Sequence, residues 1–367
     1  MRFAYAGIFM KTSLFDFHLP QSLIAVHPAN PRDNAKMLVI GDALQDRLIH
    51  ELPQFLQAGD VMVFNDTRVI PARLLGRRRQ ARVEVLLHKL SPPNGGVRYQ
   101  TPRQARGLWQ CFAKPAKRLK PGDRVDFAED FYASVMEKLP SGEIVLAFDY
   151  SPAQMHSLLA QYGHMPLPPY IERLRHADAS DHEHYQTVYA RHEGSVAAPT
   201  AGLHFTEALL ADIDAVSIQR AHVTLHVGGG TFLPVKVEDT DDHIMHSEYA
   251  EITPEAAEII NQAKARGGRV IAVGTTSLRT LESAADDDGK LHPFQDETAI
   301  FITPGYRFKI VDMLLTNFHL PRSTLFMLVS AFSGLERMQT AYAYAISSGY
   351  RFYSYGDACL LYPQKMV

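Results

Sequence analysis

Residues 253–278 read TPEAAEIINQAKARGGRVIAVGTTSL, and this stretch decides the fold. Thr253–Pro254 is a typical helix start, and Gly267–Gly268 is a typical helix end. The apolar run Arg269–Val273 then predicts a buried strand, which leads through Gly274–Ser277 into a second helix. A helix, a strand and another helix in direct succession predict an α/β protein.

The same alternation continues on both sides of this stretch. Asp60–Val69 predicts a buried strand running into a loop, and Pro152–Tyr162 predicts a helix. The proline-rich segment His164–Tyr170 is expected to be rigid and extended. One helix is expected to start near Thr206. The helix that follows the strand ending at Val273 is expected to start near Leu278. Further predicted strands or core segments are Ala221–Val227, Ala299–Ile302, Met313–Thr316 and Leu325–Phe332.

A different pattern occupies residues 75–150. Short β-type runs recur there, separated by Pro/Gly turns, and they predict a small antiparallel barrel. These runs are Arg82–Leu87, Leu108–Ala113, Arg124–Phe127 and Ile144–Phe148. We therefore expect an α/β fold: a mixed-sheet α/β core domain (residues 1–74 and 151–367, catalytic) with an inserted basic β-barrel domain (75–150).

Charge is concentrated in the predicted barrel. Between Arg73 and Arg124 there are 14 Lys and Arg against two acids, a net charge of +12. The whole chain carries −3, so the remainder carries −15. A segment this basic suits a polyanion, because cationic side chains release counterions condensed on phosphates. Tyr99, Trp109 and Phe112 could stack on bases. A solvated basic surface is the alternative.

Composition excludes several classes of protein. Hydrophobic residues make up 46% and charged residues 21% of the 367 residues, which is ordinary globular usage. No apolar run reaches the length of a membrane helix. Only two cysteines, Cys111 and Cys359, are present, so a disulfide framework is not expected and a reducing compartment is favoured. Met1–Met10 lacks a cleavage site after its apolar stretch, so we do not expect a signal peptide, and either Met1 or Met10 could be the true start.

Two glycine-containing segments could bind a ligand. In Val273–Arg279 the free N–H groups of a helix start would suit a carboxylate or phosphate, although an ordinary side-chain cap is the alternative. In His226–Phe232 three glycines would allow a ligand close to the backbone, or would form a flexible loop. This second segment is not a dinucleotide fingerprint.

Polar residues follow apolar runs at several other places, which is the usual position of α/β active sites. These places are Asp66 and Arg68, the loop Ala198–Phe205 with His204, and Asn317–Pro321 with His319. Asp242–Tyr249 adds His243 and His246, but their spacing does not fit a metal site, and we expect no metal. A structural role is the alternative for each histidine.

Together these segments resemble the S-adenosylmethionine:tRNA ribosyltransferase-isomerase family of queuosine biosynthesis. The resemblance covers nearly all of Leu14 to Tyr355, and only the N-terminal extension departs from it. The matching stretches are Phe15–Leu23, Val63–Leu74, Gly163–Ile171, His184–Tyr189, Val196–Phe205, His222–Phe232, Asp242–Tyr249, Val270–Leu278, Thr316–Leu325 and Tyr353–Ala358.

The resemblance implies transfer and isomerisation of the ribosyl moiety of S-adenosylmethionine onto 7-aminomethyl-7-deazaguanine at the wobble position of a GUN-anticodon tRNA. The product would be epoxyqueuosine-tRNA, with release of adenine and methionine. A general base must deprotonate the carbon beside the positive sulfur, and the departing adenine needs a proton. The proton-transfer candidates, among which the base is left open, are Asp66, His204, His226, His243, His246 and His319.

The resemblance also assigns binding residues. Candidates for the cosubstrate are Arg68, Thr200, Gly202, Gly228, Gly229, Gly230, Thr231, Gly274, Thr275, Thr276 and Ser277. Candidates for tRNA are Arg77, Arg78, Arg79, Lys114, Lys117, Arg118 and Lys120.

The expected protein is a cytoplasmic monomer without a membrane segment or a metal. An S-adenosylmethionine-dependent tRNA methyltransferase and a non-catalytic tRNA-binding protein are the alternatives. The oligomeric state, the order of substrate binding and the extent of the tRNA contacts stay open.

Overall fold

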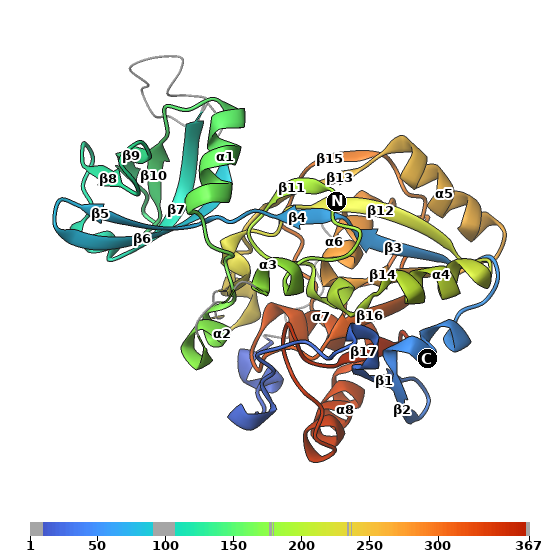
Figure 1. Ribbon diagram of the computed structural model, residues 1–367. Coiled ribbons are helices and arrows are strands. Elements are labelled where there is room, and N and C mark those ends of the chain that lie inside the picture. Colours follow the sequence, from blue (N-terminus) through green and yellow to red (C-terminus); the bar gives the residue numbers. More distant parts are fainter. Residues whose placement is uncertain are drawn as a thin grey trace.

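The computed structural model describes residues 10–90, 107–175, 178, 180–232, 235 and 237–364. Its core is a nine-stranded mixed sheet (Figure 1). In spatial order the strands are β15 (Phe294–Thr298), β13 (Glu248–Ile252), β12 (Gln219–Leu225), β3 (Val61–Asn65), β14 (Val270–Val273), β16 (Met313–Asn317), β17 (Ala358–Leu361), β1 (Lys36–Ile40) and β2 (Leu44–Leu48).

The centre of the sheet is a block of four parallel strands. β12 and β14 flank β3, and β16 pairs with β14 on its far side. Antiparallel pairs extend the sheet beyond this block, β13 on β12 and β17 on β16. Because parallel strands point the same way, the residues that follow β3, β12, β14 and β16 meet at one edge.

Helices cover both faces of this sheet. They are α4 (Glu207–Ala215), α5 (Pro254–Ala265), α6 (Gly274–Ala284), α7 (Thr324–Ser333) and α8 (Leu335–Ser347). Helix α1 (Pro152–Tyr162) packs on the barrel instead, and α2 (Pro169–Leu174) and α3 (Asp181–His184) follow it along the chain. One face, with Val61 and Val63, packs on α5 to α8. The opposite face, with Met62 and Phe64, packs on α4. Strand residues therefore alternate between two buried layers, which explains their continuous apolar runs.

Short 3-10 helices supply much of the remaining chain. They are η1 (Thr12–Phe15), η2 (Gln21–Leu23), η3 (Arg32–Asn34), η4 (Ile49–Phe55), η6 (Ala116–Arg118), η7 (Thr200–His204), η8 (Gly229–Phe232) and η9 (Thr240–Asp242). The one that matters for the site is η7, which packs through Ala201 on the face covered by α4.

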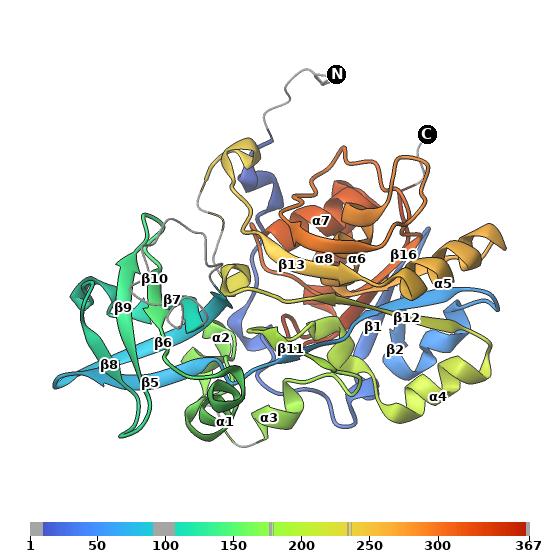
Figure 2. The same cartoon turned by 90° about the horizontal axis from the view of Figure 1, so that it is seen from above.

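The inserted segment forms a closed antiparallel barrel beside the core (Figures 1 and 2). In order around the barrel the strands are β10 (Ile144–Ala147), β7 (Leu108–Lys114), β6 (Ala81–Leu90), β5 (Arg73–Arg78), β8 (Arg124–Asp126) and β9 (Tyr132–Lys138). Its interior holds a separate apolar cluster that includes Leu74, Val85 and Phe131. The expected fold class, a mixed-sheet α/β core with an inserted small barrel, is confirmed.

The chain enters and leaves the barrel at one place in the core. β4 (Thr67–Val69) leads into β5, and after the barrel and helices α1 to α3 the chain returns as β11 (His192–Ser195), which pairs with β4. The barrel strands run from Arg73 to Ala147, close to the expected insertion. The division into residues 75–150 and the two flanking core segments stays a prediction about folding units.

Local signals located several helices correctly. Thr253 caps α5, since its hydroxyl accepts a hydrogen bond from Ala256 N at 3.2 Å, and Gly267 follows the helix with a positive φ of 82°. Thr206 caps α4 in the same way, through Leu209 N at 3.1 Å.

Two segments expected to be strands or parts of the core belong to the core without being strands. Leu325–Phe332 lies in the buried helix α7, which Ser323 caps, and an apolar run alone does not distinguish a buried helix from a strand. Ala299–Ile302 follows β15 without regular structure, and its Ile302 packs in the core. One expectation was wrong. The extended segment His164–Tyr170 stops early, since Pro169 begins α2, a position where the missing N–H costs no hydrogen bond.

Among the described residues, no helix combines the length and the apolar character needed to cross a bilayer. Tyr99 and Met1–Phe9 lie outside the described residues.

Candidate active site

Asp66 follows β3 directly and lies buried at the common edge of the parallel strands. Its Oδ1 accepts a hydrogen bond from Thr224 Oγ1 at 2.8 Å, and its Oδ2 lies 3.7 Å from His192 Nε2. Its carbonyl oxygen accepts from Arg191 N at 2.7 Å. The return of the chain after the barrel thus covers the end of β3 and fixes this carboxylate.

A second polar group joins η7 to the end of β16. Thr200 Oγ1 donates to Asn317 Oδ1 at 2.9 Å, and Asn317 Nδ2 donates to His204 Nε2 at 3.2 Å. Burial lowers the pKa of His204 to about 3, with smaller effects of Arg351 and Arg32. His204 is therefore neutral, and its Nε2 lone pair is already used by the amide, so it orients neighbours rather than accepts a proton.

His319 is held in a similar way. Its ring Nε2 lies 3.2 Å from Thr316 Oγ1, and its backbone N–H donates to Tyr342 OH. Burial lowers the pKa of the imidazole to about 3. An imidazole with so low a pKa is a weak base at neutral pH.

His226, which follows β12, differs from His204 and His319 in the hydrogen bonds of its ring nitrogens. Thr67 Oγ1 lies 3.4 Å from the His192 carbonyl as a donor, and 2.8 Å from His226 Nδ1. When the hydroxyl gives its one proton to the carbonyl, His226 Nδ1–H donates to Thr67 and the lone pair is on Nε2; in the other tautomer Thr67 donates to Nδ1 and Nε2 carries the proton. Burial lowers the pKa of His226, His192 lowers it further, and Asp66 opposes both. The ring also stacks on Tyr249, with centroids 5.8 Å apart.

The start of α6 presents unsatisfied donors. Helix α6 begins at Gly274 rather than near Leu278, and its N-cap is Val273, which has no capping side chain. Ser277 Oγ donates to Val273 O at 2.8 Å, so this hydroxyl is occupied within the helix. Thr276 Oγ1 is buried and has no hydrogen-bond partner. The uncapped first turn and this hydroxyl face the same edge of the sheet.

Arg279 lies three residues after Thr276, which places both on one face of α6. Its Nη1 forms a buried ion pair with Glu248, and its Nη2 is buried without a partner. Glu248 Oε1 also accepts a hydrogen bond from Gly228 N at 3.0 Å. Arg279 Nη2 and the helix N-terminus therefore offer hydrogen-bond donors here, while Glu248 balances the charge of the guanidinium.

The glycines at 228–230 serve contacts within the protein, where a ligand was expected. Gly229 N donates to His88 Nδ1 of the barrel at 2.8 Å. A Cβ at Gly228 would lie 2.7 Å from the His88 ring, one at Gly229 would lie 2.9 Å from Phe112, and one at Gly230 would lie 2.6 Å from His246. This segment is therefore the seam between barrel and core. The side chain of Thr231 lies outside the described residues.

Two candidates lie away from the strand ends. His243 packs edge-on against Phe301, with ring centroids 5.2 Å apart, and burial lowers its pKa. Arg68 is exposed, and its Nη2 donates to Ala190 O at 3.1 Å.

The basic side chains of the barrel divide into paired and free ones. Arg78 pairs with Asp123 at 2.7 Å, and Lys114 lies 3.8 Å from Glu84. Among the seven tRNA candidates, the exposed ones with no side-chain partner in the described part of the chain are Arg77, Arg79, Lys117, Arg118 and Lys120. β5 starts at the core, so its turn into β6, which carries Arg77–Arg79, lies at the far end of the barrel (Figure 1).

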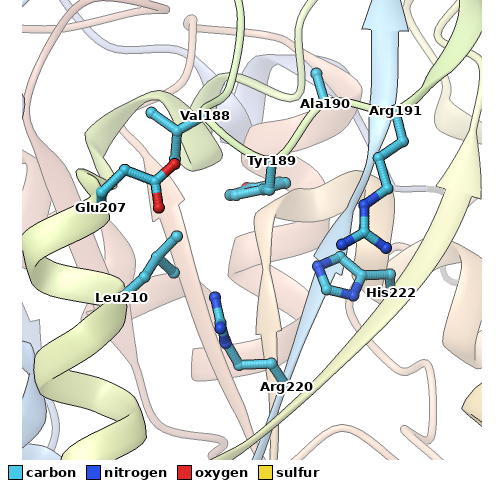
Figure 3. Close-up of a pocket in the computed structure, with 8 residues that line it drawn as sticks. All are labelled: Val188, Tyr189, Ala190, Arg191, Glu207, Leu210, Arg220 and His222. Atoms are coloured by element: carbon cyan, nitrogen blue, oxygen red, sulfur yellow. The ribbon is translucent and has the colours of Figure 1, made fainter.

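A cavity of about 470 Å³ opens on the α4 side of the sheet. Figure 3 shows the Tyr189 ring at its centre, with Arg191 and His222 on one side and Glu207 on the other. In the part of the chain that the structure describes, no cluster of three or more His, Cys, Asp or Glu could hold a metal ion.

Sequence reasoning missed several residues of this site, namely Thr67, His88, Thr187, Tyr189, Glu248 and Arg279. Their positions depend on partners distant in the chain, and only Arg279, three residues beyond Thr276 on a predicted helix, could have been found from spacing.

Fold and site define a class of protein: an α/β protein whose polar groups gather at the carboxyl ends of parallel strands, as in α/β enzymes, and to which a basic barrel is added. The chain belongs to the queuosine biosynthesis protein family, whose model matches residues 12–361. The resemblance drawn from the ten stretches is therefore confirmed.

Individual relatives match almost the whole chain. Proteins of Methylobacterium radiotolerans and Rhodospirillum rubrum, both named S-adenosylmethionine:tRNA ribosyltransferase-isomerase, are each 58% identical to it, and each alignment covers 96% of this chain and 98% of the relative. The crystal structure of S-adenosylmethionine tRNA ribosyltransferase from Thermotoga maritima is 33% identical, with a TM-score of 0.51, and covers 95% of this chain and 99% of that one.

Proposed function

We propose that the protein is a transferase that moves the ribosyl moiety of S-adenosylmethionine onto 7-aminomethyl-7-deazaguanine at the wobble position of a GUN-anticodon tRNA. The ribose isomerises to give epoxyqueuosine-tRNA, and adenine and methionine leave. The observation that carries this proposal is the 58% identity, over 96% of the chain, to proteins named for this activity.

The start of α6 would bind the carboxylate of the methionine part. Its N–H groups are uncapped, Thr276 Oγ1 has no partner, and Arg279 Nη2 is free to donate. A carboxylate accepts such charge-assisted hydrogen bonds readily, and the helix dipole adds to the attraction. The exposed Arg68, bonded to a carbonyl on the outer side of the sheet, supports this role less well.

His226 is the best supported general base among the six candidates. In the tautomer in which Nδ1–H donates to Thr67, the Nε2 lone pair is free, and the lowered pKa keeps the ring neutral. The positive sulfur acidifies the neighbouring 5′ carbon, and Nε2 would take that proton. His204 and His319 use their Nε2 atoms in hydrogen bonds, and we assign them a positioning role.

Asp66 lies close enough to His226 to raise its pKa. Its carboxylate would therefore stabilise the imidazolium that forms when His226 accepts the proton. The proton for the departing adenine would come from that imidazolium or from His246, which lies against Gly230 at the seam.

The barrel would bind the tRNA backbone. Its free cations lie partly at the far end from the core, so Arg77–Arg79 would contact phosphates away from the wobble nucleotide, while the seam near His88 and Phe112 lies closer to it. We expect the protein to act as a monomer in the cytoplasm, with no resident metal.

The test is mass spectrometry of tRNA after incubation with S-adenosylmethionine labelled in the ribose. Incorporation of the labelled ribosyl group, with free adenine and methionine, supports the proposal. Formation of S-adenosylhomocysteine would identify a methyltransferase instead, and tRNA binding without turnover would identify a non-catalytic binding protein.

A further inference from the structure

Two buried hydroxyl groups beside the site have no hydrogen-bond partner. They are Thr187 Oγ1 and Tyr189 OH, both in the loop between α3 and β11. Both side chains press against Gly202 of η7, where an added Cβ would lie 2.0 Å from Tyr189 OH and 2.8 Å from Thr187 Cγ2. The two side chains are therefore neighbours on the same side of η7.

Such groups are rare in folded proteins, because a buried hydroxyl without a partner loses its hydrogen bonds to water and gains none. The buried hydroxyl of Tyr185, four residues earlier, is not one of these unpartnered atoms, and the Ala198 backbone and the Ser354 side chain lower its pKa against the larger effect of burial. The two tyrosines belong to one segment, and only the Tyr189 hydroxyl lacks a partner among the described residues. This contrast indicates that the Tyr189 hydroxyl forms its hydrogen bond with a ligand.

The surroundings define the chemistry of that partner. Asp66 lies near enough to raise the pKa of Tyr189 further, beyond the effect of burial. The phenol is therefore neutral, and the nearby negative charge disfavours an anion. Two neutral hydroxyls, which both donate and accept, suit a neutral ligand that carries hydroxyl groups. The aromatic ring next to them also suits a positive sulfur.

The preceding residue of η7 contacts the start of α6. Ala201 faces Gly274, with 3.5 Å from a Cβ at Gly274 to the Ala201 Cβ. The donors at the start of α6 and the hydroxyl pair near Asp66 thus adjoin consecutive residues of η7. A ligand with a carboxylate at one end and a ribose at the other would contact both groups.

We propose that Thr187 and Tyr189 form the ribose-binding part of the S-adenosylmethionine site, donating and accepting hydrogen bonds with the 2′ and 3′ hydroxyls. This inference rests on the proposed function and extends it to two residues and to the orientation of the ligand. Figure 3 shows the Tyr189 ring among the residues that line the open cavity.

The test compares Tyr189→Phe and Thr187→Val with the matched control Tyr185→Phe. Calorimetry measures S-adenosylmethionine binding, and thermal unfolding measures stability without ligand. We expect Tyr189→Phe to weaken binding about tenfold while the unfolding temperature stays the same or rises, because an unpaired hydroxyl is removed. Tyr185→Phe should lower the unfolding temperature and leave the affinity unchanged.

Ligand analogues identify the contact. The full-length protein should bind analogues lacking the 2′ or the 3′ hydroxyl more weakly than S-adenosylmethionine, and the Tyr189→Phe or Thr187→Val variants should lose that discrimination. If both variants bind S-adenosylmethionine and its analogues as the unmodified protein does, the inference is wrong and the proposed function stands. If the unmodified protein does not bind S-adenosylmethionine at all, the proposed function itself fails.

Discussion

Two buried neutral histidines make the site sensitive to acid. Burial lowers the pKa values of His204 and His319 to about 3, from about 6.5 in the unfolded chain. The unfolded chain therefore binds more protons between these values, so their contribution to stability is fully present above pH 6.5 and falls as the pH drops towards 3. At about 1.4 kcal/mol per pH unit, each histidine lowers the free energy of unfolding by about 2 kcal/mol at pH 5.

His204→Gln isolates one of these contributions. Glutamine Oε1 can accept the hydrogen bond that Asn317 Nδ2 now gives to His204 Nε2, but it does not titrate. Between pH 7 and pH 5 the variant should lose about 2 kcal/mol less stability than the unmodified protein. Urea unfolding followed by circular dichroism at both pH values measures this difference, because all other titrating groups cancel.

The control is His50→Gln, at an exposed position of η4, which should keep the pH dependence of the unmodified protein. If His204→Gln loses as much stability between pH 7 and pH 5 as the unmodified protein does, His204 is not held neutral by burial and the reasoning is wrong.

Three further predictions concern the reaction. His226→Gln should lower kcat by about 10²- to 10⁴-fold with little change in the affinity for S-adenosylmethionine, and a kcat near that of the unmodified protein would exclude His226 as the base. Arg279→Met should raise the KM for S-adenosylmethionine and also destabilise the fold by about 3–5 kcal/mol, because Glu248 is left buried without its partner; equilibrium unfolding separates the two effects. Neutralising Arg77, Arg78 and Arg79 together should weaken tRNA binding and flatten its salt dependence by about one unit of slope for each lost phosphate contact; an unchanged affinity and slope would exclude the barrel end as a tRNA contact.

Much of the fold could be predicted because its signals are local. The helix start at Thr253, the turn at Gly267 and the apolar run to Val273 each depend on neighbours within a few residues. The antiparallel barrel could also be inferred, since its turns are marked by Pro and Gly. The strands β17, β1 and β2 at one end of the sheet could not, because their short runs become strands only through pairing with the strands beside them.

The sequence does not reveal that Leu325–Phe332 is a helix, because this segment is buried on all sides. Leu325–Phe332 is apolar on every face because α7 packs between the sheet and α8, so neither helical nor strand periodicity is visible. The local signals for the helix are Ser323, which caps its start, and Gly334, which follows its end with a positive φ of 92°. Pro169 shows another ambiguity. The proline-rich sequence predicts an extended segment there, although proline is equally compatible with the first turn of a helix.

The site shows a different limit, which the glycines make clear. A glycine in the sequence indicates that something approaches the backbone closely, but it does not say what. At Gly229 the approaching groups are the barrel side chains His88 and Phe112, and at Gly202 it is Tyr189. The approach at Gly202 leads to a hydroxyl without a partner, whereas Gly229 donates to a histidine that accepts its hydrogen bond. Unsatisfied atoms, which only the folded chain reveals, therefore separate a binding surface from a structural seam.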